Sequence, residues 1–576
     1  MTQTFETTAE PMASSSEPVL RVENLSIDFH LRTHILHAVR NVSFDLYPGR
    51  TLCLVGESGS GKSVTARALL RIIDKQAVVS SGRIQLNTRG QSIEISELGT
   101  NSREIRAVRG GRIGLIFQEP MSSLSPVRTI GAQIIEALRL HRKLDKRAAR
   151  QEAIELLRQV EIINPEQMVD RYTFEFSGGM RQRAMIAMAL ACDPDILIAD
   201  EPTTALDVTT QAEIMDLVKR LQASRGMAML LITHDLGIVA EVADEVAVMR
   251  FGRIVEHGTV DDIFYNAKNP YTRQLLNSTV KLGQGGRSAA ALQPERRAIL
   301  SVRDLTKVYG AACSWLGKHD DQLTAVAAAN FDLLEGENLG IVGESGSGKT
   351  TLGRLVLRVV EPTAGRVVFR PEPERDEDVT AMTKRRLMDY RRQVRLVFQD
   401  PFASLNPRMT VKQIVGDPIF VSGLARGRVL EEKVADLMEL VGLDPATMER
   451  YPHAFSGGQR QRIGIARALA LDPKIIIADE ATSALDVSIR AQILDLLLDV
   501  QKRLNLSCIF ISHDISVVRY FCDRVAVMHR GKIVELGSVQ QICDHPQEPY
   551  TQSLISAVPH ADPRNKRMLH RTKFVA

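Results

Sequence analysis

Two glycine-rich segments in this 576-residue sequence have the residue types needed to hold a nucleoside triphosphate. The first, Gly56–Ser63, reads Gly-Glu-Ser-Gly-Ser-Gly-Lys-Ser, and the second, Gly343–Thr350, differs only in its final Thr. In such a loop the glycines let backbone N–H groups turn towards phosphate oxygens at the start of a helix. Lys62 and Lys349 are therefore predicted to contact the β- and γ-phosphates.

The other loop positions are predicted to share the nucleotide and its metal. Ser63 and Thr350 would ligate Mg²⁺ through their hydroxyl groups. An accidental glycine-rich turn is a weak alternative, because each loop follows an apolar strand and opens a helix. The remaining loop residues predicted to bind ATP are Gly56, Ser58, Gly59, Ser60, Gly61, Gly343, Ser345, Gly346, Ser347 and Gly348.

An Asp-Glu pair ends an apolar run in each half of the chain. Asp200 and Asp479 stand where a carboxylate can assist Mg²⁺. Glu201 and Glu480 follow them and are the candidates to orient and polarise an attacking water. A solvent-exposed acidic pair is common at a strand end, but this pair is duplicated and followed both times by Ala-Leu-Asp.

A histidine and a glutamine complete each set. His234 and His513 follow another apolar run, where an imidazole can hydrogen-bond the γ-phosphate and hold glutamate and water in line. A lone histidine is more often structural, so this assignment depends on the duplication. Gln118 and Gln399 are predicted to touch Mg²⁺ or water through the side-chain amide, while the loop that follows reaches elsewhere.

A Ser-Gly-Gly segment precedes an Arg-rich helix in both halves. Its small residues allow close approach, so it is predicted to be a second anion-binding helix start. An ordinary serine cap is the simpler alternative, and the sequence does not tell which ATP the segment meets. The residues are Ser177, Gly178, Gly179, Ser456, Gly457 and Gly458.

The spacing of these residues shows an internal repeat. The separation in sequence is 279 residues for four matched pairs: Ser177 and Ser456, Glu201 and Glu480, Asp207 and Asp486, and His234 and His513. It is 349 − 62 = 287 for the P-loop lysines and 399 − 118 = 281 for the glutamines. A rigid scaffold keeps fixed spacing and loops absorb insertions. Two complete sets indicate that one machine uses two ATPs and that its halves act on each other.

The elements that position these residues alternate along the chain. Short apolar runs predict buried parallel strands, and amphipathic stretches between them predict helices, which is typical of an α/β sheet covered on both faces. Residues 129–172 and 410–451 predict an inserted helical subdomain in each half. The predicted apolar strands lie at 51–56, 196–200, 229–233, 339–343, 475–479 and 508–512.

The predicted domain order follows the repeat. Residues 1–17 are expected to be disordered, 18–280 to form the first module, 281–298 a linker and 299–560 the second module. Residues 561–576 form a basic tail, for which solvation is favoured over contact with an anionic membrane surface.

Composition excludes several other classes. A net charge of +4 is too small for a protein built around nucleic acid. There is no signal segment and no apolar run of about 18 residues, so no membrane span is expected. The six cysteines form no CxxC pair or zinc spacing, which favours buried thiols in a reducing cytoplasm.

The order of these motifs resembles that of the ATP-binding-cassette (ABC) ATPases over nearly the whole chain. The order is P-loop, Gln loop, Ser-Gly-Gly signature, Asp-Glu pair and His. The resemblance implies two tandem P-loop domains, each with a mainly parallel core sheet, an antiparallel β subdomain and an inserted helical subdomain. It implies head-to-tail pairing, in which the signature at 456–458 caps the first ATP and that at 177–179 caps the second. It also suggests Phe29 and Tyr309 beneath the adenines. Met180 departs from the usual Gln of the signature.

Further motifs resemble one branch of this family. Two pairs of segments resemble the oligopeptide/dipeptide importer ATPases, most closely the fused form of glutathione-type importers. They are the loops at 119–126 and 400–407 and the Pro-Tyr-Thr motifs at 270–272 and 549–551. The resemblance implies a peripheral ATPase on the cytoplasmic face of a bacterial inner membrane. Its partners would be two transmembrane permease subunits and, through them, an extracytoplasmic solute-binding protein.

Some expectations stay open within that resemblance. Certain relatives carry an iron–sulfur cluster after the Pro-Tyr motif, but the cysteine positions predict none here. Opines, oligosaccharides and nickel chelates are alternative substrates to peptides, and the roles of the basic tail and of the insertion at 310–323 are not assigned. A twin-cassette ATPase acting on ribosomes is the main rival, although its cassettes would be joined by a long charged helix. DNA-repair cassette ATPases would need zinc cysteines or long coiled coils.

Overall fold

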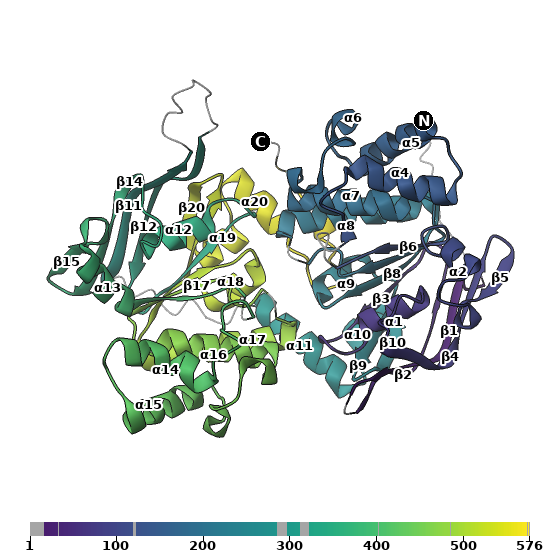
Figure 1. Cartoon of the computed structure of the whole chain (residues 1–576). Helices are drawn as coiled ribbons and strands as arrows, with labels where there is room; N and C mark the ends of the chain where they lie inside the picture. The colour runs from purple at the N-terminus through teal and green to yellow at the C-terminus, as the bar shows by residue number, and fades with distance from the viewer. Residues whose placement is uncertain are drawn as a thin grey trace, which may run out of the picture. The chain divides into compact units, whose positions relative to one another are not determined.

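The computed structural model describes residues 17–32, 34–118, 123–204, 206–284, 296–310, 322–400, 402–483, 485–572 and 574 (Figure 1). Three predicted segments lie wholly or partly outside these residues: the disordered N-terminus except Glu17, the centre of the linker, and most of the insertion at 310–323. The chain divides into two compact units. Unit 1 comprises Met1–Thr204, Asp216–Thr233 and Val242–Ile263, and unit 2 comprises Ala205–Met215, His234–Glu241 and Phe264–Ala576.

Unit 1 contains an antiparallel four-stranded sheet and a six-stranded sheet. The first has the order β2 (Ile35–Leu46), β1 (Leu20–His30), β4 (Ala77–Thr88), β5 (Gln91–Glu94). In the second, only β10 pairs antiparallel. The six-stranded order is β10 (Arg253–Thr259), β9 (Glu245–Arg250), β3 (Thr51–Val55), β8 (Ala228–Thr233), β7 (Ile196–Asp200), β6 (Ile113–Ile116).

Unit 2 repeats the same two sheets. The antiparallel sheet has the order β12 (Leu323–Leu334), β11 (Ala298–Tyr309), β14 (Ala364–Glu372), β15 (Arg375–Asp378). The six-stranded sheet is parallel except at β20. Its order is β16 (Val394–Val397), β17 (Ile475–Asp479), β18 (Ser507–Ile511), β13 (Asn338–Val342), β19 (Arg524–His529), β20 (Lys532–Ser538).

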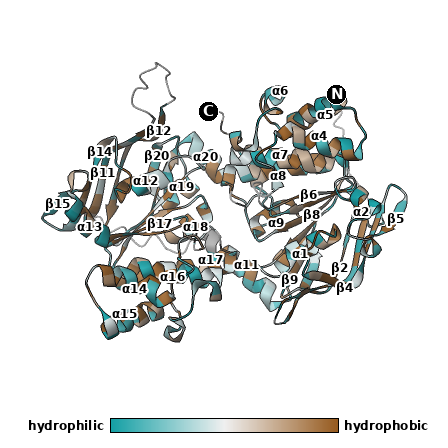
Figure 2. Cartoon of the chain, viewed as in Figure 1, coloured by the Kyte–Doolittle hydropathy of each residue, from teal (hydrophilic) through white to brown (hydrophobic). Residues whose placement is uncertain are grey.

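Burial explains why the central strands are apolar. Every residue of β3, β7 and β8 is buried, as is every residue of β13, β17 and β18. A parallel strand covered on both faces loses the apolar–polar alternation of a half-exposed strand. In Figure 2 the strand β17 is mostly brown, whereas helix α15 (Gly427–Leu440) alternates between brown and teal. The predicted α/β fold is confirmed.

Helices surround the sheets, and three of them contain residues of both units: α8 (Val208–Arg225), α9 (Leu236–Val242) and α10 (Val260–Asn266). Those of unit 1 are α1 (Lys62–Leu69), α2 (Arg103–Val108), α4 (Ile130–His141), α5 (Lys146–Gln159), α6 (Pro165–Met168) and α7 (Gly178–Leu190). Those of unit 2, besides α15, are α11 (Pro270–Gln284), α12 (Lys349–Val356), α13 (Lys384–Gln393), α14 (Val411–Val421), α16 (Gly457–Leu469), α17 (Val487–Leu504), α18 (Ile515–Phe521), α19 (Val539–Asp544) and α20 (Pro549–Ser556).

The inserted helical regions begin where the sequence predicts. The side chain of Thr129 accepts a hydrogen bond from the Ala132 N–H and caps α4, and Thr410 caps α14 through the Gln413 N–H. A threonine cap satisfies an N–H group that has no partner within the helix. Helices α4 to α6 occupy the region predicted at 129–172, and α14 and α15 that at 410–451.

The basic tail differs from expectation. Met568 is fully buried, and the backbone N–H groups of Arg567 and Met568 donate to one carboxylate oxygen of Glu241 at 2.9 and 3.0 Å. All of these residues belong to unit 2. The prediction of a solvated tail is therefore wrong for this stretch. The charge pattern predicts exposure, but Met568 packs in the interior and the buried carboxylate of Glu241 accepts hydrogen bonds from the tail backbone.

In the part of the chain that the structure describes, no helix is both long and apolar enough to cross a membrane.

Candidate functional site

Each P-loop wraps its own lysine. Lys62 Nζ donates to the carbonyl oxygens of Gly56 and Glu57 at 2.7 and 2.9 Å. Lys349 Nζ makes the matching bonds to the carbonyls of Gly343 and Glu344 at 2.8 and 2.7 Å. Both lysines are about nineteen-twentieths buried, so each charge is held by carbonyl dipoles inside the loop.

The first glycine of each loop is required by close packing. Gly343 has φ +151°, and a Cβ there would lie 2.1 Å from the carbonyl oxygen of Met528. Gly56 has the same conformation, with Met249 O at 2.2 Å from the position of a Cβ. Any side chain would force the loop away from the neighbouring strand, so the loop shape that the sequence predicts for phosphate depends on these glycines.

The predicted magnesium residues lie together in each half. Ser63 Oγ donates to Asp200 Oδ1 at 2.9 Å, and Thr350 Oγ1 donates to Asp479 Oδ1 at 3.1 Å. Burial raises the pKa of both aspartates, and the neighbouring glutamates raise it further, although these hydroxyl groups lower it. A hydroxyl beside a desolvated carboxylate offers the hard oxygen donors that suit Mg²⁺.

The glutamates and glutamines also meet. Gln118 Nε2 donates to Glu201 Oε2 at 2.9 Å, and Gln399 Nε2 donates to Glu480 Oε2 at 2.6 Å. Both glutamates have φ +46°, the left-handed region that costs a non-glycine residue about 1 kcal/mol. Such strain is typical of functional sites.

The histidine of the second half lies beside the glutamate of its own set. His513 Nδ1 lies 3.3 Å from Glu480 Oε1. Burial pushes the pKa of Glu480 up, but the hydrogen bond and charge of His513, together with the charge of Lys349, hold it below its usual value. Glu480 is therefore kept ionised, as a group that polarises water must be. In the first half, Glu201 belongs to unit 1 and His234 to unit 2.

The two signatures start long helices. Ser177 Oγ accepts from the Met180 N–H at 3.3 Å at the start of α7. Ser456 Oγ accepts in the same way from Gln459, whose side chain also accepts the Ser456 N–H at 3.0 Å, so only the second signature has a reciprocal cap. Each leaves free N–H groups at a helix start of positive potential, where an anion would bind.

Two first-half residues meet the second P-loop inside unit 2. Thr209 Oγ1 donates to Glu344 Oε1 at 2.7 Å, and Asp207 accepts a backbone hydrogen bond from Ser345. The sequence pattern included Asp207 in the repeat and in the Ala-Leu-Asp motif but predicted no contact for it, and it did not single out Thr209. A signal existed, because Ser488 places a second hydroxyl 279 residues later, but hydroxyl residues are too common to single out.

The two candidate adenine residues remain predictions. Phe29 packs against the core of unit 1 from β1. Tyr309 ends β11 with 42% of its surface exposed, and Lys307 Nζ lies 5.1 Å from its ring centroid. An exposed aromatic face can stack on a base, whereas Phe29 already serves the core.

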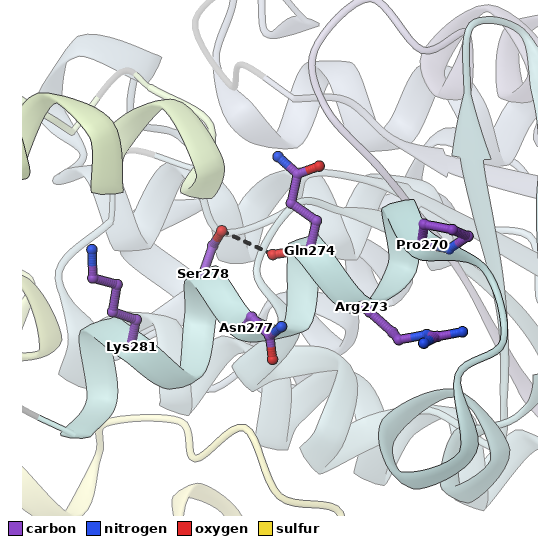
Figure 3. A pocket seen from close by; sticks show the side chains of 6 residues that line it. All are labelled: Pro270, Arg273, Gln274, Asn277, Ser278 and Lys281. Atoms are coloured by element: carbon purple, nitrogen blue, oxygen red, sulfur yellow. Dashed lines mark hydrogen bonds between the residues drawn. The ribbon is translucent and has the colours of Figure 1, made fainter.

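The described cysteines and one surface hollow lie apart from the predicted site residues. Cys53, Cys192, Cys508, Cys522 and Cys543 are buried free thiols, and Cys313 lies outside the described residues. Within those residues, no group of three or more His, Cys, Asp or Glu side chains is placed to hold a metal ion. A surface hollow along α11 contains none of the predicted site residues (Figure 3). Its lining is Pro270, Arg273, Gln274, Asn277, Ser278 and Lys281.

Comparison with known proteins shows the family of this chain. The family described as ABC transporter matches residues 39–204 and 326–483, more than half of the chain. The family described as oligopeptide/dipeptide transporter, C-terminal region, matches residues 255–314 and 534–573. The chain is similar to the glutathione import ATP-binding protein GsiA of Escherichia coli strain K12, with 46% identity over 95% of this chain and 91% of the relative.

Two further relatives illustrate the range of similarity. The GsiA protein of Salmonella choleraesuis strain SC-B67 is 47% identical over 96% of this chain and 91% of its own length. The solved dimeric cassette MJ0796, bound to ADP and phosphate, is 28% identical, with a TM-score of 0.37, over 42% of this chain and 98% of that one.

Proposed function

The chain belongs to the ABC transporter family as the ATP-hydrolysing subunit of an importer, and we propose that it powers uptake of peptides or similar small solutes through two separate permease subunits. The observation that carries this proposal is the double set of site residues. Each half keeps its lysine, acidic pair, glutamine and histidine, and the contacts between the loop hydroxyl and aspartate and between glutamine and glutamate recur in both.

Each residue has a role in this proposal. The lysine and the loop N–H groups hold the β- and γ-phosphates. Ser63 with Gln118, and Thr350 with Gln399, would bind Mg²⁺, with Asp200 and Asp479 beside them; bound Mg²⁺ neutralises developing phosphate charge. Glu201 and Glu480 orient the attacking water, and His234 and His513 hold the γ-phosphate and the glutamate in line.

The two cassettes would complete each other's sites. In the first site, 456–458 would cap the ATP held by Lys62, and in the second, 177–179 would cap the ATP held by Lys349. The Thr209–Glu344 hydrogen bond and the Asp207–Ser345 contact support this pairing, because they join first-half residues to the second P-loop. ATP must then bind the closed pair better than the open one, so that binding drives closure and hydrolysis reverses it.

The proposed location and cargo follow from the relatives. The similar proteins are named for the import of glutathione, a tripeptide, so a peptide is the proposed substrate class. The ATPase would sit at the cytoplasmic face of a bacterial inner membrane, and a solute-binding protein would act on it through the permeases. Opines, oligosaccharides and nickel chelates remain alternative cargoes within the same proposal.

A reconstitution experiment tests the proposal. The tagged chain should co-purify with two transmembrane permease subunits. In proteoliposomes, its ATP turnover should rise when the solute-binding protein is added with a peptide such as glutathione. The variant carrying both Glu201→Gln and Glu480→Gln is the control and should show no such rise. Recovery of ribosomes in place of permeases would contradict the proposal.

A further inference from the structure

The Pro-Tyr-Thr motif of the second half reaches the second P-loop. Tyr550 is the second residue of α20, and only 4% of its surface is exposed. Its hydroxyl oxygen accepts a hydrogen bond from the backbone N–H of Glu344 at 3.1 Å. None of the ATP-site roles above uses Tyr550, and its motif lies in the region shared with oligopeptide and dipeptide transporters.

The bonded peptide group is the one that holds the lysine. The peptide between Gly343 and Glu344 presents its carbonyl oxygen to Lys349 Nζ at 2.8 Å and its N–H to Tyr550. A trans peptide is planar and its C=O and N–H point in opposite directions, so fixing one end fixes the other. The carbonyl of Glu344 also accepts from Lys349, at 2.7 Å.

We propose that Tyr550 is a positioning residue for the second ATP site, which orients the Gly343–Glu344 peptide and, through it, the phosphate-binding Lys349. The inference rests on the proposed function. The C-terminal extension thereby contributes directly to nucleotide binding by its own cassette. Thr209 holds the Glu344 side chain at 2.7 Å, so that one P-loop residue is fixed through its N–H, its carbonyl and its carboxylate.

Two rings fix the position of the Tyr550 hydroxyl. The His529 ring stacks on Tyr550 with centroids 4.0 Å apart and planes 19° apart. Phe574 meets both rings edge-on, at 5.6 Å from His529 and 5.8 Å from Tyr550. His529 ends β19, which pairs with β13, the strand that leads into the P-loop. Both ends of the hydrogen bond are thus tied to the same sheet.

The hydroxyl and the ring are separable. Burial raises the pKa of Tyr550, so the phenol is neutral at neutral pH. Tyr550→Phe keeps the stacking ring and removes only the acceptor for the Glu344 N–H. If Tyr550 serves packing alone, that change leaves nucleotide binding unaltered. If it positions the peptide, binding at the second site weakens.

The test measures ADP binding to the full chain in two backgrounds, each with one P-loop disabled. With Lys62→Ala, only the second site binds, and Tyr550→Phe should weaken ADP binding about threefold to tenfold, the effect of one neutral hydrogen bond. With Lys349→Ala, only the first site binds, and the same change should have no effect. Tyr520→Phe is the matched control, because it removes a buried tyrosine hydroxyl that bonds Asp495 instead.

Each result decides the matter. No change in the Lys62→Ala background, or equal weakening in both backgrounds, would overturn the role of Tyr550. The role of Tyr550 would also be overturned if Tyr520→Phe weakened ADP binding as much as Tyr550→Phe. Full two-site binding in the chain with both lysines replaced would overturn the proposed ATP sites themselves, and the positioning role with them.

Discussion

At the start of α16, Ser456 and Gln459 exchange two hydrogen bonds, whereas at the start of α7 Met180 leaves Ser177 with one. The P-loops show no comparable difference, since both lysines make the same bonds to loop carbonyls and both loop hydroxyls meet an aspartate. The groups proposed to bind phosphate recur in both halves, whereas the third residue of the signature helix differs. The halves are thus expected to match in chemistry and to differ in local stability.

The largest predicted effect tests the equality of the chemistry. Replacing Glu201 and Glu480 together by Gln should lower ATP turnover about 10²- to 10⁴-fold, because water loses the carboxylate that polarises it. ATP binding should persist, and the closed state should accumulate. Steady-state hydrolysis and equilibrium ATP binding check both parts.

The single variants then compare the halves. If the sites are equivalent, Glu201→Gln and Glu480→Gln lower turnover equally. A large loss from one and none from the other would show that a single site carries hydrolysis. Unchanged turnover in the double variant would remove both glutamates from the mechanism.

A smaller effect concerns the buried aspartates. Folding raises the pKa of Asp200 and Asp479, so each binds its proton more tightly when folded. Their contribution to folding stability is therefore lost as the pH rises through the raised pKa, and the charged groups destabilise the nucleotide-free protein at neutral pH. Asp200→Asn and Asp479→Asn should each raise its Tm at pH 7.

The matched measurements separate stability from binding. The gain in Tm should shrink as the pH falls below the usual pKa of an aspartate, where both forms are neutral. Added Mg²⁺ and ATP should stabilise the variants less than the parent. A lower Tm for either variant in nucleotide-free buffer at pH 7 would contradict the argument.

The smallest predicted effect concerns the signature helices. Met180→Gln should add the missing reciprocal hydrogen bond and stabilise the first turn of α7 by about 0.5–1 kcal/mol, and Gln459→Met should destabilise that of α16 by a similar amount. Amide hydrogen exchange in the two first turns measures both changes. ATP turnover should stay near the parent value, so a large loss would show that position 180 touches nucleotide.

Much of the candidate ATP site could be proposed from the sequence because its parts are local. A P-loop is contiguous in sequence, and its glycines declare the backbone that it needs. Asp200 and Asp479 could be placed because parallel strands bring their carboxyl ends to one edge of a sheet. The left-handed backbone of Glu201 and Glu480 left no mark in composition, since glutamate does not favour that conformation.

The burial of the C-terminal tail could not be predicted from the local charge pattern. Its charges predict solvation, and Met568 alone does not indicate burial. The buried carboxylate of Glu241 that receives it lies more than 300 residues earlier in the chain, so no local spacing links them. The same holds for Thr209 and Glu344, which are separated by 135 residues.

By itself, the sequence determined that this chain is a duplicated α/β ATPase with two candidate sets of phosphate-binding residues, because hydrophobic periodicity and contiguous glycine loops are local properties. Tertiary structure alone decided which distant side chains support those residues. Tyr550 lies 206 residues from Glu344, and its hydrogen bond exists only because the folded chain returns α20 to the P-loop. Contacts of that kind depend on the path of the backbone through space.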